Sequence, residues 1–343
     1  MTRSNRRAFV TAAAGVIAAS YLSRRALADD AIKLRFSLDT APSHPRNQAI
    51  SDYLGKLEEA SQGKIKTELF QSGQLFADLN VTKALLQGHV DMASPGTWTM
   101  TGLVPDCDFC QLPALYSPQV ELFRRCSDGP AGEHVNKQLE AKLRSHILGT
   151  WLELGNDNWY TTRKEIRSLD DIAGLKIRSP GGAGISWRIG FVHGIPNVTP
   201  WPNVPLALSQ GTFDGFVSTD ESVNSAKLWE AGVKYSYADH GFYANYIPIV
   251  SDAFWSKLGL AEQKLMRDVW AANIARYRTM AAKSQADARE AMISHGVSFA
   301  DPSPEQVAAD RKRMIAAQGD LIRATKLSAE IVKLVTDTVG SHS

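Results

Sequence analysis

Residues 175–215 read LKIRSPGGAGISWRIGFVHGIPNVTPWPNVPLALSQGTFDG. The alternation of apolar runs with glycine and proline predicts a strand, a helix, an irregular aromatic loop, a second helix and a second strand. Arg178 stands at the exit of the first predicted strand. Because ligands of open α/β sheets bind beyond the carboxyl ends of the strands, this arginine is a candidate ligand-binding residue.

Part of this stretch has a counterpart earlier in the chain. Residues 84–91 and 207–214 match at A-L-x-Q-G-x-x-D, 123 positions apart. Each copy predicts a helix that ends at a glycine, which adopts the left-handed conformation at little cost, and then a short apolar strand, at 90–93 and 213–217. We interpret the pair as two similar α/β lobes. A chance match of this common helix–glycine–strand pattern is the alternative.

The segments that follow the two repeated strands are candidates for ligand binding. Residues 94–97 and 218–220 would face each other across a cleft between the lobes. This arrangement makes Thr97, Ser218 and Asp220 candidate ligand contacts. Asp220 fits equally well as the N-cap of the next helix.

The first 28 residues have the features of an export signal. They contain five arginines and no acidic residue, with Arg6-Arg7 ahead of an apolar run at 8–22 and an A-x-A cleavage site at 26–28. The paired arginines resemble a twin-arginine signal. The apolar run is shorter than the roughly 20 residues that span a bilayer. We therefore expect a cleaved signal and a periplasmic protein, rather than an uncleaved membrane anchor.

Removal of this segment would change the net charge from +2 to −3, because its five arginines would be lost. A weakly acidic chain argues against a nucleic-acid-binding surface. The roughly 315 residues that would remain are ample for two lobes with their own cores.

Three cysteines lie close together in the sequence. Cys107, Cys110 and Cys126 fit either one disulfide with a free thiol, or buried thiols. The C-x-x-C at 107–110 is compatible with redox chemistry or half a metal site. It lacks the setting of a thioredoxin motif, and no histidine has ligand spacing to it. We expect structural cysteines, no metal site and no cofactor.

The other patterns predict further elements. Strands are expected at 33–38, 64–70, 147–152 and 159–162, and helices at 47–61, 120–146, 167–174, 183–192, 203–210 and 222–231, with a turn-rich segment at 196–205. From residue 261 the chain reads as almost entirely helical, with a break near 301–304. Ser303 and Gln306 can form a capping box there, with Pro304 at the first helical position.

Four short motifs together resemble a known family. They are K-I-R-S-P at 176–180, A-L-S-Q-G-T-F-D-G at 207–215, S-Q-G-K-I at 61–65 and S-G-Q-L at 72–75. The combination is similar to the periplasmic solute-binding proteins of TRAP transporters, the DctP-like family. The resemblance covers nearly the whole chain after the export signal. It implies an α/β fold with two similar lobes around a cleft, of the periplasmic binding protein type II-like kind, with long C-terminal helices spanning both.

The resemblance also implies a domain plan. The signal peptide occupies 1–28, lobe I occupies 29–150 plus about 236–260, lobe II occupies 151–235 plus the C-terminal helices, and a long connecting helix occupies 261–294.

In the family, the arginine of the K-I-R-x-P motif clamps the substrate carboxylate, which implies that role for Arg178. A guanidinium can hold a carboxylate or sulfonate through two charge-assisted hydrogen bonds. Two positions depart from the family pattern: Asp157 stands where dicarboxylate and sialate members carry an arginine, and Ser218 replaces an asparagine. Both changes favour a monocarboxylate or sulfonate with hydroxyl or amine groups over a C4-dicarboxylate. Asn156, Ser218 and Asp220 are possible further partners.

Aromatic residues offer candidate walls for the site. Trp201 lies in the loop where the family places site residues, and Trp159 starts the short strand predicted at 159–162. We expect both rings to pack on the ligand, whereas Trp98 and Trp187 fit the core. His44, in the loop after the first strand, either donates to the ligand or caps the following helix.

The favoured function is a receptor that binds a small organic anion and delivers it to the two integral membrane subunits of a TRAP transporter. An exported enzyme acting on a small organic acid and a periplasmic ligand sensor are the alternatives. No catalytic triad order, nucleophile elbow or nucleotide-binding glycine motif supports the enzyme. We expect no enzymatic activity and no nucleic-acid partner.

Overall fold

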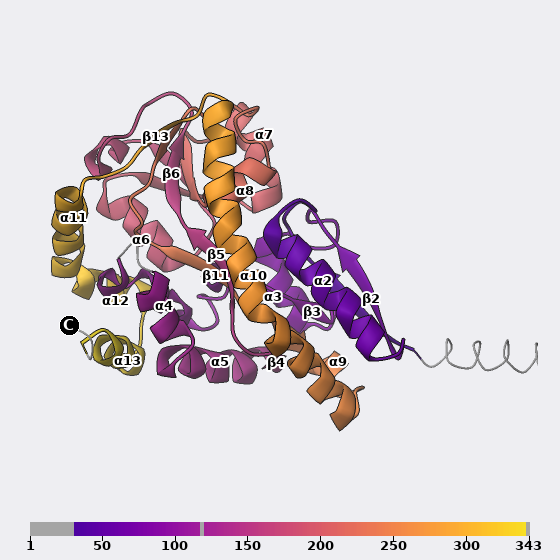
Figure 1. Cartoon of the computed structure of the whole chain (residues 1–343). Coiled ribbons are helices and arrows are strands. Elements are labelled where there is room, and N and C mark those ends of the chain that lie inside the picture. Colours follow the sequence, from indigo (N-terminus) through magenta and orange to yellow (C-terminus); the bar gives the residue numbers. More distant parts are fainter. Residues whose placement is uncertain (1–30, 117–119, 341–343) are drawn as a thin grey trace, which may run out of the picture.

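The computed structural model describes residues 31–116 and 120–340 (Figure 1). The signal peptide predicted at 1–28 lies outside these residues and stays a prediction. Within the described ranges, no helix combines the length and apolar character needed to cross a membrane.

Two separate sheets form the frame of the molecule. The first has the strand order β2-β1-β3-β12-β4. Its strands are β1 (Ile32–Ser37), β2 (Ile65–Phe70), β3 (Met92–Ala93), β4 (Ser145–Ile147) and β12 (Ile249–Ser251). The second has the order β13-β10-β6-β9-β7-β8. Its strands are β6 (Asn158–Thr161), β7 (Lys176–Ser179), β8 (Ile195–Val198), β9 (Gly215–Ser218), β10 (Tyr235–Tyr237) and β13 (Ser298–Ala300).

The chain passes between the two sheets through a two-stranded antiparallel ribbon. The ribbon pairs β5 (Leu152–Asn156) with β11 (Tyr243–Tyr246), with an irregularity in its register after Ala244. We call the part built on the first sheet the first lobe and the part built on the second sheet the second lobe.

Helices cover both sheets (Figure 1). Up to residue 225 they are α2 (Pro45–Ala60), α3 (Asp78–Leu86), α4 (Val120–Ser127), α5 (Pro130–Leu143), α6 (Ala183–Phe191), α7 (Val204–Ser209) and α8 (Asp220–Ser225). After it they are α9 (Asp252–Trp255), α10 (Leu260–Ser294), α11 (Pro304–Ala316), α12 (Gln318–Thr325) and α13 (Ala329–Gly340). Short 3₁₀ turns lie at Thr97–Thr99, Pro105–Gln111, Pro113–Leu115, Leu169–Ile172 and Trp201–Asn203.

The sequence repeat is a structural repeat. Gly88 after α3 and Gly211 after α7 have φ of 70° and 68°, in the left-handed region. In both copies the residue after the glycine donates to the carbonyl five positions earlier, at 2.9 Å. These glycines therefore end their helices in the same way, as the sequence predicted.

The aspartate that ends each repeat anchors its strand to the neighbouring strand. The Asp91 carboxylate accepts from the Arg35 backbone N–H at 2.9 Å, and the Asp91 N–H donates to the Arg35 carbonyl at 3.1 Å. Asp214 makes the same pair of bonds with Lys176, both at 2.8 Å. The two lobes thus share one helix–strand unit, built on β1 in the first lobe and on β7 in the second.

The long helix α10 ties the lobes together. It runs for 35 residues and packs against α2, β5 and α8 (Figure 1). Its buried apolar residues recur mostly three or four positions apart, which keeps them on one face. They are Met266, Trp270, Ile274, Tyr277, Ala281, Ala288 and Met292. The long helix predicted at 261–294 is confirmed.

Some predicted elements were wrong in extent. The helix predicted at 120–146 is two helices, because Gly129 and Pro130 end α4 and start α5. The single strand predicted at 147–152 is wrong: Ile147 ends β4, Leu152 starts β5, and the residues between them connect the two strands. The helix predicted at 222–231 ends at Ser225 and starts two residues earlier, at Asp220.

Several strands were not predicted, among them the two edge strands of the second sheet. Ile195–Val198 lies in a segment read as turn-rich, yet it forms the edge strand β8, where Pro196 needs no partner for a missing N–H. Ser298–Ala300 lies in the segment read as helical and forms the other edge, β13, beside β10. The capping box of Ser303 and Gln306 at the start of α11 is confirmed.

The lobe boundaries predicted from the sequence stay a prediction. The second sheet includes Tyr235–Tyr237, so the chain leaves this sheet only after residue 237. Among the C-terminal helices, α12 packs against α6, whereas α13 packs against α4 and α5.

The three cysteines are free and buried. Burial raises the pKa of Cys110 to about 12 and that of Cys126 to about 11, and it raises the pKa of Cys107 well above its usual value. These groups are therefore thiols at neutral pH, and a thiol is a poor nucleophile and metal ligand. Across residues 31–116 and 120–340, no cluster of three or more potential metal ligands occurs.

Candidate ligand-binding site

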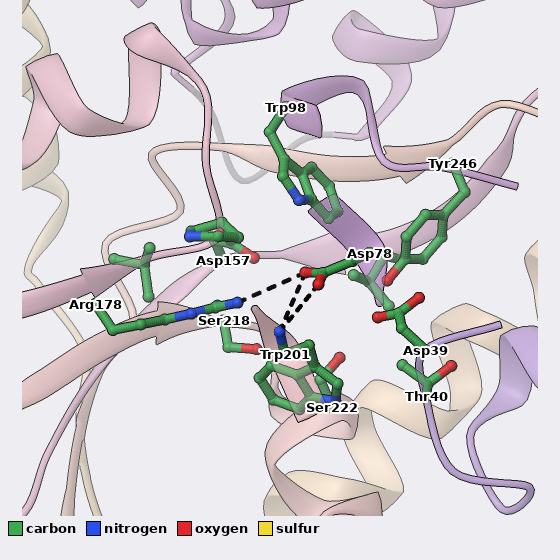
Figure 2. Close-up of a pocket in the computed structure, with 13 residues that line it drawn as sticks. Asp39, Thr40, Asp78, Trp98, Asp157, Arg178, Trp201, Ser218, Ser222 and Tyr246 are labelled. Carbon is green, nitrogen blue, oxygen red and sulfur yellow. Dashed lines mark hydrogen bonds and ion pairs between the residues drawn. The ribbon is translucent and has the colours of Figure 1, made fainter. Parts of the chain in front are cut away.

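A small cavity is lined by side chains from both lobes and from the ribbon that joins them (Figure 2). The first lobe contributes Asp39, Thr40, Asp78 and Trp98, and β11 contributes Tyr246. The second-lobe side contributes Asp157, Arg178, Trp201, Ser218 and Ser222. The free space is about 30 Å³, enough for roughly two water molecules. The described conformation is therefore a closed one, with little room for an organic acid.

Arg178 is the cation that lines this cavity. It lies in β7, between β8 and β9, and only 2% of the residue is exposed. Its Nε donates to the Thr199 carbonyl at 2.9 Å, its guanidinium lies 5.5 Å from the centre of the Trp201 ring, and one terminal nitrogen is 3.9 Å from an Asp78 carboxylate oxygen. That terminal nitrogen has no hydrogen-bond acceptor among the described residues. Burial lowers the pKa of Arg178, although nearby aspartates oppose the shift.

Asp78 bridges the two lobes. It is the first residue of α3, and its carboxylate accepts from the backbone N–H of Trp201 at 3.1 and 3.2 Å (Figure 2). Burial and the nearby Asp39 raise the pKa of Asp78 to about 6, against the opposing effect of Arg178. The bond to Trp201 can form only while the lobes are closed.

Asp157 connects β5 to β6 and lies beside Arg178 (Figure 2). Only 5% of it is exposed, and no described N–H or O–H group donates a hydrogen bond to its carboxylate. Burial raises its pKa to about 7, while Arg188 and Arg178 lower it and Asp239 raises it. Arg188 forms an ion pair with Asp239, so it is not a dedicated counter-ion of Asp157.

A second buried arginine lies behind the cavity wall. Arg46, near the start of α2, forms an ion pair with Asp39, donates to Thr40 Oγ1 at 2.9 Å and to the Ser94 carbonyl at 3.3 Å, and lies 3.9 Å from the centre of the Tyr246 ring. Its charge is thus directed to Asp39. Arg46 holds the lining residues Asp39 and Thr40 in place. Arg178 is therefore the cation that faces the cavity.

Four of the residues predicted from the sequence line this cavity: Arg178, Trp201, Ser218 and Asp157. Their role as ligand contacts stays a prediction. The other five predicted residues lie elsewhere.

His44 is fully buried behind the cavity. Its Nδ1 accepts from the Arg46 N–H at 3.1 Å, which caps α2, and its Nε2 is 3.2 Å from Ser222 Oγ in the second lobe. Because Nδ1 accepts, Nε2 carries the proton and donates to Ser222. Burial and then Arg46 hold the pKa of His44 well below its usual range, so the ring is neutral. Of its two predicted roles, the structure places it as the helix cap.

Trp159 and Thr97 lie in the interior. Trp159, in β6, is covered by the Arg188 guanidinium at 5.3 Å from the ring centre. Thr97 starts a 3₁₀ turn, where it hydrogen-bonds to Cys110. Neither residue lines the cavity that contains Arg178.

Asn156 and Asp220 line a different cavity, on the side of α10. Asp220 accepts from Asn158 Nδ2 at 2.7 Å and from the Tyr160 hydroxyl. It is the first residue of α8, whose N-cap is Thr219. The expectation that Asp220 faces the first lobe across the ligand cavity therefore has no support in the geometry.

The sequence interpretation missed Asp39, Thr40, Asp78, Ser222 and Tyr246. It also assigned Trp98 to the core, whereas this buried ring lines the cavity. The structural repeat relates Asp39 and Thr40 to the segment after Arg178, because Arg35 and Lys176 make equivalent bonds and residues 37–40 are thus the counterparts of 178–181. The sequence repeat at 84–91 and 207–214 does not extend to these residues. Asp78 and Tyr246 reach the cavity from elements far away in the sequence, and no motif marks them.

Comparison with known proteins gives one consistent family. The model of the family described as "Bacterial extracellular solute-binding protein, family 7" matches residues 36–321. The C4-dicarboxylate-binding periplasmic protein DctP of Rhodobacter capsulatus is 27% identical over 241 residues, covering 69% of this chain and 70% of that protein. The sialic acid-binding periplasmic protein SiaP of Vibrio cholerae is 23% identical over 251 residues, covering 73% and 77%.

Solved structures show the same fold. The sugar acid binding protein DctPAm from Advenella mimigardefordensis, in complex with galactonate, superposes with a TM-score of 0.85 at 23% identity, covering 92% of this chain and 99% of that one. A TRAP periplasmic solute binding protein from Sulfurospirillum deleyianum, with bound succinate, gives 0.81 at 23% identity, covering 89% and 99%. The predicted fold class, two α/β lobes with a long helix across them, is confirmed.

Proposed function

Because the chain belongs to the bacterial extracellular solute-binding proteins of family 7, we propose that it is the periplasmic receptor of a TRAP transporter. It binds one small organic anion, a carboxylate or a sulfonate, in the cavity between the lobes. It then delivers this ligand to the membrane subunits of the transporter. It acts as a receptor and not as an enzyme.

The observation that carries this proposal is the buried guanidinium of Arg178. A buried cation with an unpartnered N–H group is destabilising unless an acceptor occupies the adjacent space. The cavity provides that space, and the nearest carboxylate, Asp78, is 3.9 Å away and already accepts from Trp201. A ligand carboxylate would supply the missing acceptor and hold its orientation through two parallel bonds.

The same cavity disfavours a second anionic group. Asp39, Asp78 and Asp157 all line it, and their repulsion of a second carboxylate would be poorly screened in a closed, largely dry site. We therefore propose a ligand with a single negative group, in contrast to the C4-dicarboxylates and succinate of some relatives.

Binding requires the lobes to open and close. The free space of about 30 Å³ is far below the volume of an organic acid, so the ligand enters an open form. Contacts from the ligand to both lobes would then favour the closed form, because a ligand shifts a conformational equilibrium by its differential affinity for the two states.

A thermal-shift screen of the purified protein against organic acids tests the proposal. A ligand that binds only the folded state raises the melting temperature by mass action. Hits are measured by calorimetry with Arg178→Ala, for which we expect a loss of about 2–5 kcal/mol of binding free energy. Arg163→Ala is the matched control, because it removes an exposed arginine of the same lobe.

Near-native affinity in Arg178→Ala would contradict the assignment of the site. Arg178→Lys gives a second measure, since it retains the charge but loses the paired hydrogen bonds. We expect it to bind more weakly than the native protein and more tightly than the alanine variant.

A further inference from the structure

We propose that the ligand of this cavity is a small zwitterion, an amino carboxylate whose carboxylate binds Arg178 and whose ammonium group binds Asp157. The inference rests on the proposed receptor function and specifies the ligand class. It is carried by three features of the cavity: an unpartnered carboxylate, an excess of negative charge, and aromatic walls.

Asp157 differs from the other buried aspartates of the described residues. The others all have donors: Asp78 accepts from Trp201, Asp91 from Arg35, Asp106 from Ser328, Asp108 from the Gly184 N–H, Asp220 from Asn158 and Asp310 from Arg313, and Asp239 pairs with Arg188. Asp39, which is partly exposed, pairs with Arg46. Asp157 is buried, with only 5% of the residue exposed. No group in the part of the chain that the structure describes donates a hydrogen bond to its carboxylate. A buried carboxylate that faces a cavity without a donor points to a donor on the ligand.

The charge balance decides what kind of donor the ligand carries. Three carboxylates line the cavity, against Arg178 within it and Arg46 behind its wall. A ligand with a carboxylate alone would satisfy Arg178 but increase the negative excess. A hydroxyl group would donate a hydrogen bond to Asp157 without offsetting its charge. An ammonium group donates a hydrogen bond to Asp157 and also offsets its negative charge. Such charge-assisted bonds are stronger than neutral ones.

Aromatic rings complete a suitable environment for a cation. Trp98, Trp201 and Tyr246 line the cavity, and Trp98 lies above Asp78, between Asp157 and Tyr246, in Figure 2. One face of the Trp201 ring and one of the Tyr246 ring are already used by Arg178 and Arg46. The Trp98 ring has no arginine stacked on it within the described residues, so it can receive the ammonium side of the ligand.

The ionisation of Asp157 gives this proposal a distinctive pH dependence. Asp157 faces Arg178 of β7, Arg188 of α6 and Asp239 after β10, with Asp78 of α3 across the cavity, and its pKa lies at about 7. An ammonium ligand binds the ionised form. Its affinity should therefore rise between about pH 6 and pH 8, by up to roughly tenfold per pH unit below the pKa. A hydroxy acid whose hydroxyl oxygen accepts a hydrogen bond from neutral Asp157 would show the opposite trend.

Calorimetry with pairs of ligands of equal carbon skeleton tests the inference. The pairs are 3-aminopropanoate with 3-hydroxypropanoate, 4-aminobutanoate with 4-hydroxybutanoate, and the amino and hydroxy members of any skeleton that the organic-acid screen identifies. For the pair whose carbon skeleton fits the cavity, we expect the amino acid to bind roughly 10- to 100-fold more tightly than the hydroxy acid at about pH 8. We expect this advantage to shrink towards about pH 6.

The variant Asp157→Asn should remove the preference. It should weaken the amino ligand roughly 10- to 100-fold and leave the hydroxy ligand almost unchanged. Asp287→Asn on the exposed face of α10 removes one negative charge far from the cavity and is the control.

The outcomes separate this inference from the proposed function. Equal or tighter binding of hydroxy or unsubstituted acids, still lost in Arg178→Ala, would overturn the zwitterion and retain the receptor. An amino preference that survives in Asp157→Asn would also overturn it. Binding of no organic acid in either set would contradict the receptor function, and the inference with it.

Discussion

At the scale of single residues, the cavity is a set of buried charges with incomplete partners. Arg178 has one terminal nitrogen without an acceptor, and Asp157 has a carboxylate without a donor. Both are almost fully buried, and yet they do not pair with each other within 4 Å. Such groups lower the stability of the ligand-free protein, and a ligand that satisfies both recovers this free energy on binding.

The first prediction follows from the pKa of Asp157. In the folded protein it is about 7, above the ordinary value of 3.8 that applies to the unfolded chain. Between these values the folded state binds a proton that the unfolded state has lost, so the contribution of Asp157 to the free energy of unfolding falls as pH rises. Asp157→Asn should therefore be more stable than the native protein by roughly 1–4 kcal/mol at about pH 8, and equally stable near pH 4.

Chemical denaturation of both ligand-free proteins across this pH range measures the effect. The variant Asp170→Asn, which removes an exposed carboxylate of the same lobe, should show no such pH-dependent difference. An asparagine variant that is less stable at about pH 8 would mean that the native carboxylate has a donor after all.

The predictability of the site depended on where each residue lies in the sequence. Arg178 and Ser218 belong to motifs or lie directly beside them, so their positions near strand ends could be predicted. Asp78 could not, because its role depends on how α3 of one lobe meets Trp201 of the other. A contact between lobes is a property of the tertiary fold, and local sequence patterns do not encode it.

At the scale of elements, the ribbon β5–β11 is fixed to the helices around it by one buried carboxylate. Glu153 in β5 accepts from Arg124 of α4 at 2.6 and 2.7 Å and from the Tyr243 hydroxyl at 3.0 Å, and it lies 3.1 Å from Nε of Arg278 in α10. Arg278 in turn pairs with Asp128 at 2.6 and 2.8 Å. The strand through which the chain passes between the lobes is thus attached to both α4 and α10.

We predict that Glu153→Gln lowers the free energy of unfolding by about 2–3 kcal/mol, because the half-buried Arg124 loses its bidentate carboxylate and Arg278 keeps only Asp128 as its counter-charge. Denaturant titration measures it. Glu121→Gln is the matched control: Glu121 also lies near Arg124, at 3.9 Å, but its side chain is 72% exposed. The control should change stability by about 1 kcal/mol or less. A loss of similar size in the two variants would contradict this account.

Elements with strong periodicity were predicted well, and short elements were not. The 35 residues of α10 carry enough turns for the spacing of apolar residues to be unambiguous. The strands β8 and β13 have four and three residues, and their pairing with β7 and β10 defines them more than their own composition does. The break between α4 and α5 was marked by Gly129-Pro130 and could have been predicted.

At the scale of the whole molecule, few polar bonds hold the lobes together around the cavity. The Asp78 carboxylate to the Trp201 N–H and His44 Nε2 to Ser222 Oγ are two of them. The first-lobe partner is the N-cap of α2 in one bond (His44) and the first residue of α3 in the other (Asp78). The second partner of each bond belongs to the second lobe. The position of the lobes is therefore sensitive to single substitutions at these points.

We predict that Asp78→Ala shifts the ligand-free protein towards an open form. The substitution removes a carboxylate whose two oxygens share the Trp201 backbone N–H, an interaction worth roughly 1–3 kcal/mol. Its loss should change the ratio of the open to the closed form by about 5- to 150-fold. Small-angle X-ray scattering should show a larger radius of gyration for the variant, and saturating ligand should reduce it. Asp268→Ala, on the exposed side of α10, is the control. Identical scattering from all three ligand-free proteins would contradict the prediction.

The insertion of β12 into the first sheet has a consequence for the order in which the protein forms. This strand, at Ile249–Ser251, lies between β3 and β4, whose paired residues are more than 150 and more than 100 positions earlier. During synthesis, the first sheet stays in two unconnected pieces until about residue 251 has emerged. Closing so long a loop is entropically costly, and proteins rich in such distant contacts fold slowly. A fragment that stops before β12 should remain without a stable core, so the first lobe matures only after nearly all of the second has been made.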